Sequence, residues 1–230
     1  MSRRHLISGA TSGIGAAIAQ RLLSEGDEVI PIVRSKSDAL RMGAQNFILC
    51  DFNHPEKVRQ ACLELDFEID SFINAAGIAI GKPIWDTDEI EARQMLNVNL
   101  ISPMFACGAL RNNLRSGGSI ILFSSQSAFR GGWDDLYNVS KGGINTFIKS
   151  FAIKVAPDIR VIGIAPGITE NTRMTLGRKN DDLDRIRATI PLKRFANVDE
   201  IAALTFALLS DAGSYMTGSV VDVNGGNYLR

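Results

Sequence analysis

Residues 5–15 read His5-Leu6-Ile7-Ser8-Gly9-Ala10-Thr11-Ser12-Gly13-Ile14-Gly15, and this stretch decides the fold of the 230-residue chain. Its apolar first residues predict a strand over 5–8, and a glycine-rich turn follows at once. Apolar residues then recur at helical spacing over 13–25. A strand that passes through such a turn into a helix is typical of the opening of a βαβ unit.

The glycines of this turn have separate physical roles. Gly9 permits a tight turn, Gly13 lets the backbone approach a pyrophosphate, and Gly15 lets the helix pack closely on the strand. The N–H groups at the start of the helix attract phosphate. The stretch therefore predicts a dinucleotide site, and its expected cofactor-binding residues are Gly9, Thr11, Ser12, Gly13, Ile14 and Gly15.

The rest of the chain alternates short apolar runs with longer helical segments. Strands are predicted over 5–8, 29–33, 46–50, 71–74, 119–124, 160–165 and 220–223. Helices are predicted over 13–25, 86–110, 136–156 and 198–210, the second capped by Asp86 or Thr87, the third ended by Pro157 and the fourth preceded by Asn197. This order predicts an α/β fold, a single-domain Rossmann-type doubly wound parallel sheet of about seven strands over residues 1–230, with helices on both faces.

Composition narrows the classes of function. Twenty-five basic and 25 acidic residues give a formal net charge of zero, which argues against a dedicated partner of nucleic acid or of membrane surfaces. The sequence has no apolar run of about 18 residues and no secretory signal pattern, so no membrane span and a cytoplasmic location are expected. The three cysteines, Cys50, Cys62 and Cys107, form no C-x-x-C pair, and neither a disulfide nor a metal site is expected.

A tyrosine and a lysine stand four residues apart in the third predicted helix. Tyr137 and Lys141 therefore share one face of that helix. A nearby ammonium favours the phenolate, so the pKa of Tyr137 is expected to be lowered. Such a phenol can exchange a proton with an alcohol or carbonyl oxygen near neutral pH. Ser124 and Ser125 end the preceding strand, where a hydroxyl can face the same space.

The glycine turn and residues 118–141 resemble the short-chain dehydrogenase/reductase family, and within it the 3-oxoacyl-[acyl-carrier-protein] reductases. The resemblance implies that Tyr137 is the acid/base, that Ser125 polarises the substrate oxygen, and that Lys141 lowers the tyrosine pKa and holds the nicotinamide ribose. The family serine usually lies thirteen residues before the tyrosine, which is the place of Ser124, whereas Ser125 lies twelve before it. Alignment of the strand favours Ser125, with one residue missing from loop 129–135; Ser124 is the alternate and Ser127 a more distant one.

Further motifs resemble the family in order along residues 6–226. Asn74-Ala75-Ala76-Gly77 resembles the turn after the fourth strand, with alanine replacing a second asparagine. Asn99 resembles the fourth catalytic residue, which holds a water in a proton relay to the lysine. After the sixth strand, the family backbone and a following threonine meet the nicotinamide carboxamide; Thr172 is expected in that role, with Thr169 as the alternative. The cofactor residues that these motifs imply are Asn74, Ala75, Gly77, Tyr137, Lys141, Pro166, Gly167, Ile168 and Thr172.

The end of the second strand indicates which dinucleotide is bound. An acidic residue there binds the ribose hydroxyls of NAD, and an arginine accommodates the 2′-phosphate of NADP. Here Arg34 and Ser35 follow the strand, and no carboxylate stands where NAD needs one. NADP(H) is therefore predicted rather than NAD(H), unless Arg34 is simply a solvated loop charge. Asp51 and Phe52, after the third strand, complete the cofactor site that the resemblance implies.

These features predict an NADP(H)-dependent oxidoreductase that reduces a ketone, for example a carrier-bound 3-oxoacyl thioester, to a secondary alcohol. The alternatives are an NAD(P)-dependent dehydrogenase of a small alcohol or sugar, and a nucleotide-binding regulatory protein without catalysis. Residues 168–194 are expected to form a substrate lid, whose Arg173, Arg178 and Lys179 either attract an acidic carrier or are merely solvated. Phe129 and Trp133 are expected to wall the pocket or simply to pack. The resemblance also implies a homo-oligomer, a tetramer or a dimer.

Overall fold

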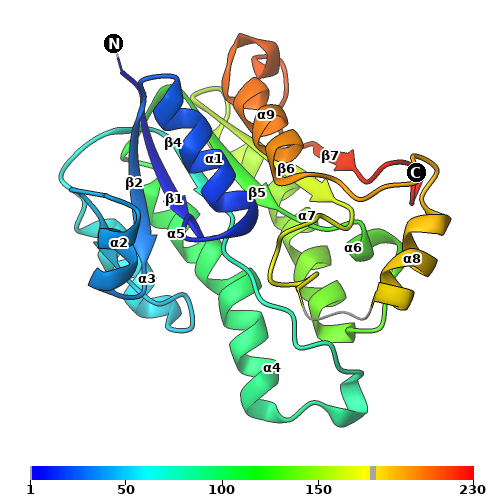
Figure 1. Ribbon diagram of the computed structural model, residues 1–230. Coiled ribbons are helices and arrows are strands. Elements are labelled where there is room, and N and C mark those ends of the chain that lie inside the picture. Colours follow the sequence, from blue (N-terminus) through cyan, green and yellow to red (C-terminus); the bar gives the residue numbers. More distant parts are fainter. Residues whose placement is uncertain (1, 177–179) are drawn as a thin grey trace.

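The computed structural model describes residues 2–176 and 180–230, and its central feature is a twisted parallel sheet (Figure 1). In this described part of the chain, seven strands lie in the order β3-β2-β1-β4-β5-β6-β7, and every neighbouring pair is parallel. The doubly wound sheet expected from the sequence is thereby confirmed. The strands are β1 Arg4–Ser8, β2 Glu28–Val33, β3 Ile48–Leu49, β4 Ile69–Asn74, β5 Leu114–Phe123, β6 Ile159–Pro166 and β7 Val220–Val223.

Helices cover both faces of the sheet. Successive residues of a strand point to opposite faces, so Leu6 belongs to the core under α3, α5 and α7, whereas Ile7 belongs to the core under α1 and α9. Phe72 and Ile73 divide in the same way on β4. Burial on both faces explains why these strands read as apolar throughout. The helices of this two-sided cover are α1 Gly13–Ser24, α3 Pro55–Leu63, α5 Ser102–Leu110, α7 Asp135–Val155 and α9 Val198–Leu209, with α1 beside α9 (Figure 1).

The chain reverses its direction of travel across the sheet between β1 and β4. Strands β2 and β3 are added on one side of β1, and the strands from β4 onward on its other side. Ser8 pairs with Asn74 where these two neighbours end. In open α/β sheets, ligands bind outside the carboxyl ends of the strands at such a reversal. The glycine turn after β1 and the Asn74 turn after β4 therefore meet at the place where a dinucleotide is expected.

The segment expected to be one long helix over 86–110 is divided. A 3₁₀ turn over Ile84–Asp86 is followed by α4 Glu89–Leu96, by a π-helical turn, η2, over Asn97–Ile101, and then by α5. The cap of α4 is Asp88, whose carboxylate accepts from Glu91 N at 2.8 Å within a capping box, so the prediction of Asp86 or Thr87 was wrong. Thr87 instead donates its hydroxyl to the carbonyl of Pro83 at 2.9 Å.

The remaining helices of the described residues are short. They are α2 Lys36–Arg41, α6 Ser127–Arg130 and α8 Asn180–Thr189, and a 3₁₀ turn covers Asp211–Gly213. The predicted cap of α9 is confirmed, because the Asn197 side chain accepts from Asp199 N at 3.0 Å. Of the helices described, none is long and apolar enough to cross a lipid bilayer.

Candidate active site

The turn after β1 has the geometry that only glycine permits. Gly9 has φ +74°, and a Cβ on it would lie 2.6 Å from Ala75 C and from Ala76 N. Gly13 has φ +56°, and a Cβ on Gly15 would lie 2.3 Å from Gly9 O. Contacts below 3 Å with backbone cannot be relieved by rotating a side chain, so these positions exclude any larger residue. The close approaches at Gly9 and Gly15 bring the start of α1 against the ends of β1 and β4, and the expected approach of Gly13 to a pyrophosphate stays a prediction.

The first turn of α1 is suited to an anion. Ser12 is the N-cap residue but makes no side-chain cap hydrogen bond, and the first turn carries no acidic residue. Its backbone N–H groups and the positive end of the helix dipole favour a phosphate. Thr11 is exposed beside them, whereas Ser12 and Ile14 are half-buried. These features of the chain fit the pyrophosphate of a dinucleotide.

Tyr137 and Lys141 lie on one face of α7, as their spacing predicts. The Lys141 ammonium nitrogen is 5.8 Å from the centroid of the Tyr137 ring. Asp134 caps the helix and accepts from Tyr137 N at 3.0 Å, which fixes the first turn. Lys141 is buried and donates to the carbonyl of Phe123, at the end of β5, at 2.8 Å. The pair therefore stands at the carboxyl edge of the sheet, where β5 ends.

Burial sets the protonation behaviour of both groups. It lowers the pKa of Lys141 to about 8, because a charged amine is costly away from water. Burial raises the pKa of Tyr137, and the hydrogen bond with the Ser125 side chain opposes this rise only in part. The expected lowering of the tyrosine pKa is thus wrong for this structure, because desolvation outweighs the Ser125 side chain and the negative charge of Asp134 adds to the rise of the pKa. Tyr137 consequently keeps its proton at neutral pH.

The two candidate serines face different groups. The Ser125 side chain is near enough to Tyr137 to oppose the rise of its pKa, and its Oγ lies 2.8 Å from Ser127 Oγ. The Ser124 hydroxyl is buried and donates to the carbonyl of Lys141 at 3.5 Å, on the backbone of α7. This arrangement favours Ser125 as the serine that reaches a substrate, with Ser127 beside it.

Asn99 is held in the π-helical turn η2, immediately beside the lysine. Its amide nitrogen donates to the carbonyl of Ile78 at 2.8 Å, and its amide oxygen accepts from Ile78 N at 2.9 Å. A Cβ on Gly77 would lie 3.5 Å from both Asn99 Oδ1 and Lys141 Nζ. Gly77 thus lies close to both of these side chains. π-helical turns are frequent at functional sites because they redirect one side chain out of the helical register.

The exits of β2 and β3 carry the other predicted cofactor residues. Arg34 is exposed, and Ser35 is the N-cap residue of α2. The pKa of Asp38 is lowered, first by its hydrogen bond with Ser35, then by Arg41, and least by Arg34. Asp38 is thus bound by Ser35 and Arg41, and among the described residues no ion pair joins it to the exposed Arg34.

The third strand leads into a turn with its own contacts. The Asp51 carboxylate accepts from Asn53 N at 2.9 Å, and Phe52 is buried with its carbonyl bound to Ser102 Oγ at 2.6 Å. At the neighbouring strand ends, Ser8 Oγ donates to Asn74 Oδ1 at 2.6 Å. The Asn74 side chain is therefore used to join β4 to β1, beside the backbone of Ala75.

The segment after β6 reaches back over the glycine turn. A Cβ on Gly13 would lie 3.6 Å from Thr172 Cγ2. Thr169 is buried and donates to the carbonyl of Gly167 at 3.2 Å, which fits a structural role and favours Thr172 near a cofactor. Pro166 ends β6 and Ile168 is half-buried.

Helix α8 follows within the expected lid. Arg173, before this helix, is exposed. Arg178 and Lys179, the other two lid cations of the sequence analysis, lie outside the described residues. The expectation that these two attract an acidic carrier stays a prediction.

Asp134 organises the loop opposite Tyr137, a role that the sequence analysis did not assign. Its carboxylate accepts from Ile80 N at 2.9 Å and from Gly81 N at 2.7 Å, besides capping α7. The next loop residues bring Trp85 and Trp133 into an edge-to-face pair with centroids 6.3 Å apart, both mostly exposed. An aspartate immediately before the helix that carries Tyr137 was the available signal for this anchor.

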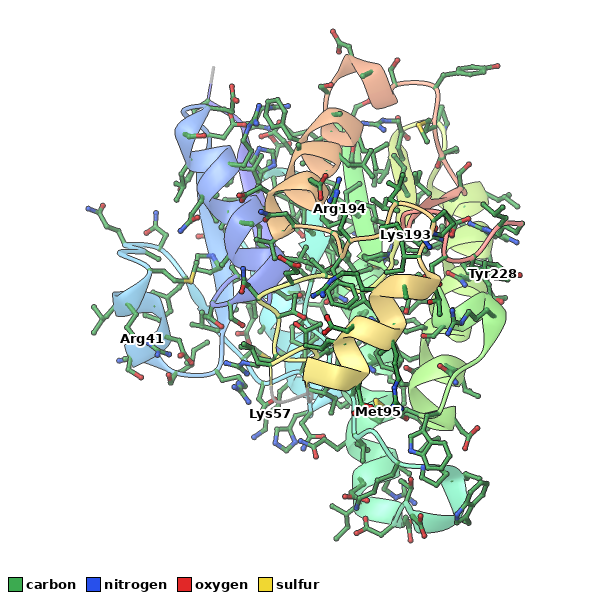
Figure 2. The ribbon with its side chains drawn as sticks, turned by 45° about the vertical axis from the view of Figure 1, so that its right-hand side comes forward. Arg41, Lys57, Met95, Lys193, Arg194 and Tyr228 are labelled. Atoms are coloured by element: carbon green, nitrogen blue, oxygen red, sulfur yellow. The ribbon has the colours of Figure 1, made fainter. Side chains whose placement is uncertain are left out.

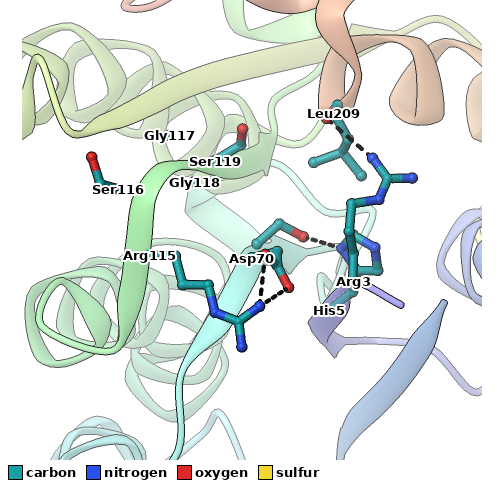
Figure 3. A pocket seen from close by; sticks show the side chains of 10 residues that line it. Arg3, His5, Asp70, Arg115, Ser116, Gly117, Gly118, Ser119 and Leu209 are labelled. Carbon is teal, nitrogen blue, oxygen red and sulfur yellow. Dashed lines mark hydrogen bonds and ion pairs between the residues drawn. The ribbon is translucent and has the colours of Figure 1, made fainter. Parts of the chain in front are cut away.

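A polar cavity of about 130 Å³ lies at the opposite, amino ends of β1, β4 and β5 (Figure 3). Its charged groups are already partnered: Asp70 accepts from Arg4 N at 2.6 Å and from Arg115 at 3.2 Å. His5 binds Ser71 Oγ at 2.7 Å. This cavity is remote from the carboxyl edge and from the groups assembled there.

Comparisons with known proteins agree with this geometry. A family model described as "Enoyl-(Acyl carrier protein) reductase" matches residues 9–227. Carbonyl reductase family member 4 of Xenopus tropicalis is 32% identical over 241 residues and covers 100% of both chains. The acetoacetyl-CoA reductase of an Acinetobacter species is 31% identical and covers 98% of this chain and 97% of its own length. A short chain dehydrogenase of Burkholderia cenocepacia, solved in complex with NADP, is 27% identical and matches with a TM-score of 0.89 over 98% of this chain and 97% of that chain.

Proposed function

Because the chain belongs to the short-chain dehydrogenase/reductase family, we propose that it reduces a ketone to a secondary alcohol with NADP(H). The observation that carries the proposal is the meeting of Ser125, Tyr137 and Lys141 at the carboxyl edge of the sheet, beside the glycine turn. A bound nicotinamide would supply the hydride in this reaction. The side chains of this protein would hold the carbonyl and deliver the proton.

Tyr137 is proposed as the proton donor to the carbonyl oxygen. Its raised pKa keeps it protonated at neutral pH, which is the state that a reduction needs at the start. Ser125, whose side chain influences the pKa of Tyr137, can donate to the oxygen as negative charge develops on it. Lys141 places an ammonium 5.8 Å from the ring centroid and stabilises the phenolate that forms when the proton leaves. Asn99 holds the loop after Gly77 through its two hydrogen bonds with Ile78.

Replacing Tyr137 with phenylalanine tests this assignment. We expect Tyr137→Phe to lower kcat by about 10²- to 10⁴-fold, since it removes general acid catalysis while leaving the fold intact. NADPH affinity, measured by fluorescence titration, should stay near wild type. Tyr215→Phe is the matched control, because Tyr215 is fully exposed and far along the chain from the site. A Tyr137→Phe variant with near-normal turnover would refute the role.

NADP(H) is proposed over NAD(H) because of the β2 exit. Arg34 is exposed there, and the nearby Asp38 is bound by other groups. A guanidinium is suited to a 2′-phosphate. The structural relative solved with NADP agrees with this choice. We expect kcat/KM for NADPH to exceed that for NADH, and Arg34→Asp to reverse or abolish the preference; a wild-type preference for NADH would contradict the proposal.

A 3-oxoacyl thioester is proposed as the substrate class. The support is the 31% identity, over nearly full length, to an acetoacetyl-CoA reductase. Thioesters carried on CoA and on acyl carrier protein should be assayed beside simple ketones, with both cofactors. The reverse reaction should be assayed with small alcohols and sugars. Turnover only of the latter would favour the dehydrogenase alternative, and turnover of none would favour a non-catalytic nucleotide-binding protein.

The lid, the assembly and the location belong to the same proposal. Residues 168–194 would close over the substrate, since Thr172 already lies against the glycine turn. A homo-oligomer, a tetramer or a dimer, is supported by exposed apolar side chains on two long helical segments, Ile90 on α4 and Ile153 on α7. Gel filtration with light scattering would measure the assembly. A cytoplasmic location remains part of the proposal.

A further inference from the structure

We infer that residues 224–230, here named the closing segment, position the turn that carries Ser125; this inference rests on the proposed function of Ser125. Figure 1 places this end of the chain beside β7 and near α8. Its side chains reach the turn formed by Ser125, Gln126 and α6, which we name the serine turn. The residues involved act through other groups and are positioning residues.

Phe129 is the main contact of the closing segment with the serine turn. The ring of Tyr228 stacks on it, with centroids 6.3 Å apart and an interplanar angle of 11°. The Arg230 guanidinium carbon lies 3.8 Å from the centroid of the same ring. Tyr228 is labelled in Figure 2, on the side of the molecule occupied by this segment. Phe129 is therefore engaged by the protein itself, which supports the packing alternative of the sequence analysis over a substrate wall.

The closing segment is itself attached to the rigid sheet. Arg230 Nε donates to Asp222 Oδ2 at 2.6 Å, and its Nη2 donates to the carbonyl of Val220 at 2.5 Å. Both acceptors belong to β7. The Asn224 side chain donates to the carbonyl of Tyr228 at 2.9 Å and accepts from Gly226 N at 2.9 Å, which folds the segment back on itself. The clamp on Phe129 is thus anchored to the sheet.

A second contact reaches closer to the catalytic serine. Asn227 Nδ2 donates to Gln126 Oε1 at 3.3 Å, and Gln126 is buried directly after Ser125. The amide oxygen of the same side chain, Asn227 Oδ1, accepts a hydrogen bond from Thr189 Oγ1 at the end of α8, at 3.4 Å. One residue therefore links the serine turn to the helix of the proposed lid.

The serine turn needs such external support because it is too short to hold its own shape. Helix α6 spans four residues, Ser127–Arg130, and isolated helical turns of this length are unstable in water. Ser125 Oγ accepts from Ser127 N at 3.2 Å, so the hydroxyl is oriented by the first residue of α6. A shift of α6 would carry the Ser125 hydroxyl away from Tyr137. The closing segment fixes α6 through Phe129, and hence the serine.

The test compares Tyr228→Ala with Tyr228→Phe and Leu229→Ala. Tyr228→Ala removes the stacking on Phe129, whereas Tyr228→Phe keeps it; Leu229 is 82% exposed in the same segment and serves as the matched control. We expect Tyr228→Ala to lower kcat about 10-fold to 100-fold through misplacement of Ser125. The dissociation constant of NADPH should stay within about twofold, because the glycine turn is not part of this contact. Tyr228→Phe and Leu229→Ala should behave as wild type.

Hydrogen exchange of residues 126–131 supplies a readout that does not need turnover. These amides should exchange faster in Tyr228→Ala than in wild type, at an unchanged overall melting temperature. Unchanged kcat in Tyr228→Ala overturns the inference, and so does a parallel loss of kcat and NADPH affinity, which would indicate general damage. If the wild-type protein reduces no carbonyl compound, the proposed function is wrong. Hydrogen exchange then tests the positioning role by itself: unchanged exchange in Tyr228→Ala would contradict this role, and faster exchange would support it.

Discussion

Two adjacent serines after β5, Ser124 and Ser125, have side chains that contact different groups. The Ser125 hydroxyl contacts Ser127 and its side chain influences the pKa of Tyr137, whereas the Ser124 hydroxyl donates to the backbone of α7. Alternation along an extended chain places neighbours on opposite sides, so only one of the two can serve the site. The sequence favoured Ser125 on alignment alone, and the contacts support the same choice.

Alanine substitution of the two serines should separate these roles. Ser125→Ala is expected to lower kcat by about 10²- to 10³-fold, because it removes a donor to the developing oxyanion. Ser124→Ala should leave kcat within a few-fold, since the Ser124 hydroxyl only meets the carbonyl of Lys141 at 3.5 Å. Steady-state kinetics on the best ketone of the panel measures both. A larger loss in Ser124→Ala would assign the catalytic role to Ser124.

Burial of the Lys141 ammonium in the candidate active site destabilises the folded protein. Its ammonium is buried, with the carbonyl of Phe123 as its acceptor at 2.8 Å, and its pKa is lowered to about 8. We expect Lys141→Met to raise the free energy of unfolding at pH 7 by about 1–3 kcal/mol. Lowering the pKa of a buried amine by one corresponds to about 1.4 kcal/mol of destabilisation of the folded state, which the methionine removes. The loss of the hydrogen bond to Phe123 offsets part of this gain. The same variant should lose turnover.

The pH dependence of unfolding checks this interpretation of Lys141. Below pH 8, Lys141 is charged in both the folded and the unfolded protein, and the folded protein is destabilised by the full cost of burying the ammonium. Between pH 8 and 10.5, Lys141 loses its proton in the folded protein but keeps it in the unfolded chain, so the stability of the wild type rises relative to that of Lys141→Met. Urea unfolding at pH 7, 8.5 and 10 measures the difference. Lys149→Met, on an exposed position of the same helix, is the control and should show no such trend. A destabilised Lys141→Met at pH 7 would contradict the argument.

The sequence predicted which residues meet in the site better than how those residues behave. The need for glycine at Gly9 and Gly15 follows from local geometry, and the shared face of Tyr137 and Lys141 follows from helix periodicity. The direction of the tyrosine pKa did not follow. Desolvation depends on everything that surrounds the phenol, and spacing along one helix reports only the neighbour four residues away.

At the scale of elements, the region before α5 differs most from the expectation. Asp86, Thr87 and Asp88 are all residues that cap helices, so composition alone cannot select among them. In the structure Asp88 forms the capping box with Glu91, although Glu89 stands at the same spacing from Asp86, because Asp86 belongs to the 3₁₀ turn that precedes the helix. The π-helical turn at Asn99 was equally hidden, since its contacts with Ile78 come from a loop 21 residues earlier.

Removing the cap of α4 should cost stability without changing the chemistry. Asp88→Ala is expected to lower the free energy of unfolding by about 1 kcal/mol, because it leaves the Glu91 N–H without its acceptor. For a domain of this size that corresponds to about 2–4 °C in Tm. Asp86→Ala is the control and should have a smaller effect. Thermal unfolding measures both, and an equal loss in the two variants would mean that the capping box contributes little.

At the scale of the whole molecule, the carboxyl and amino edges of the sheet carry different groups. The carboxyl edge gathers the glycine turn, the serine turn and the start of α7, whereas the amino edge is closed by ion pairs. The doubly wound parallel sheet was predictable from the alternation of strands and helices along the chain. The amino-edge contacts and the closing segment were not, since they join residues distant in sequence, such as Arg3 with Leu209 and Gln126 with Asn227.

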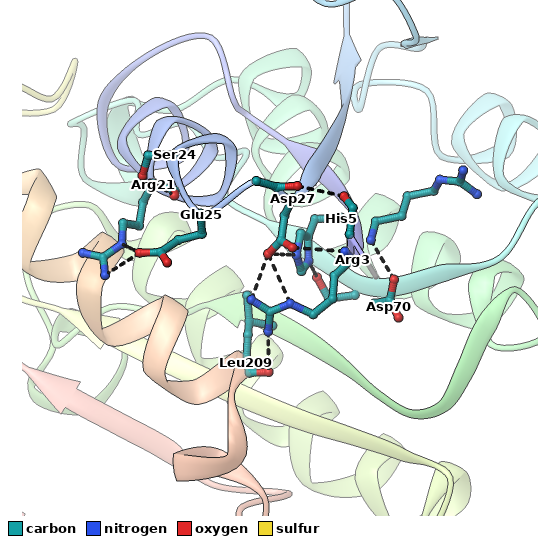
Figure 4. Close-up of polar contacts among 12 residues, drawn as sticks. Arg3, His5, Arg21, Ser24, Glu25, Asp27, Asp70 and Leu209 are labelled. Carbon is teal, nitrogen blue, oxygen red and sulfur yellow. Dashed lines mark hydrogen bonds and ion pairs between the residues drawn. The ribbon is translucent and has the colours of Figure 1, made fainter.

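A buried histidine lies at the centre of the amino edge (Figure 4). His5 Nε2 is 3.1 Å from Asp27 Oδ2, and its Nδ1 is 2.7 Å from Ser71 Oγ. Arg3 binds the same carboxylate at 2.8 Å, and Asp70 and Arg115 face the adjoining cavity. Burial lowers the pKa of His5; Asp27 opposes this shift but does not reverse it. The neutral imidazole, donating to Asp27 and accepting from Ser71, is therefore the native form.

This histidine should make the folded protein sensitive to mild acid. The unfolded chain takes up a proton on His5 at its ordinary pKa of 6.5, whereas the folded protein resists it, so stability is complete above pH 6.5 and falls as the pH drops below that value. Protonation of Asp27 affects stability only below pH 3.8, the usual pKa of an aspartate, because hydrogen bonds from Arg3 and His5 outweigh burial and lower the pKa of Asp27. Urea unfolding at pH 7.5, 6.5 and 5.5 should show a loss that His5→Asn abolishes. His54→Asn, at the exposed histidine, should retain it. Equal pH slopes in wild type and His5→Asn would show that the buried imidazole already accepts its proton in the native state.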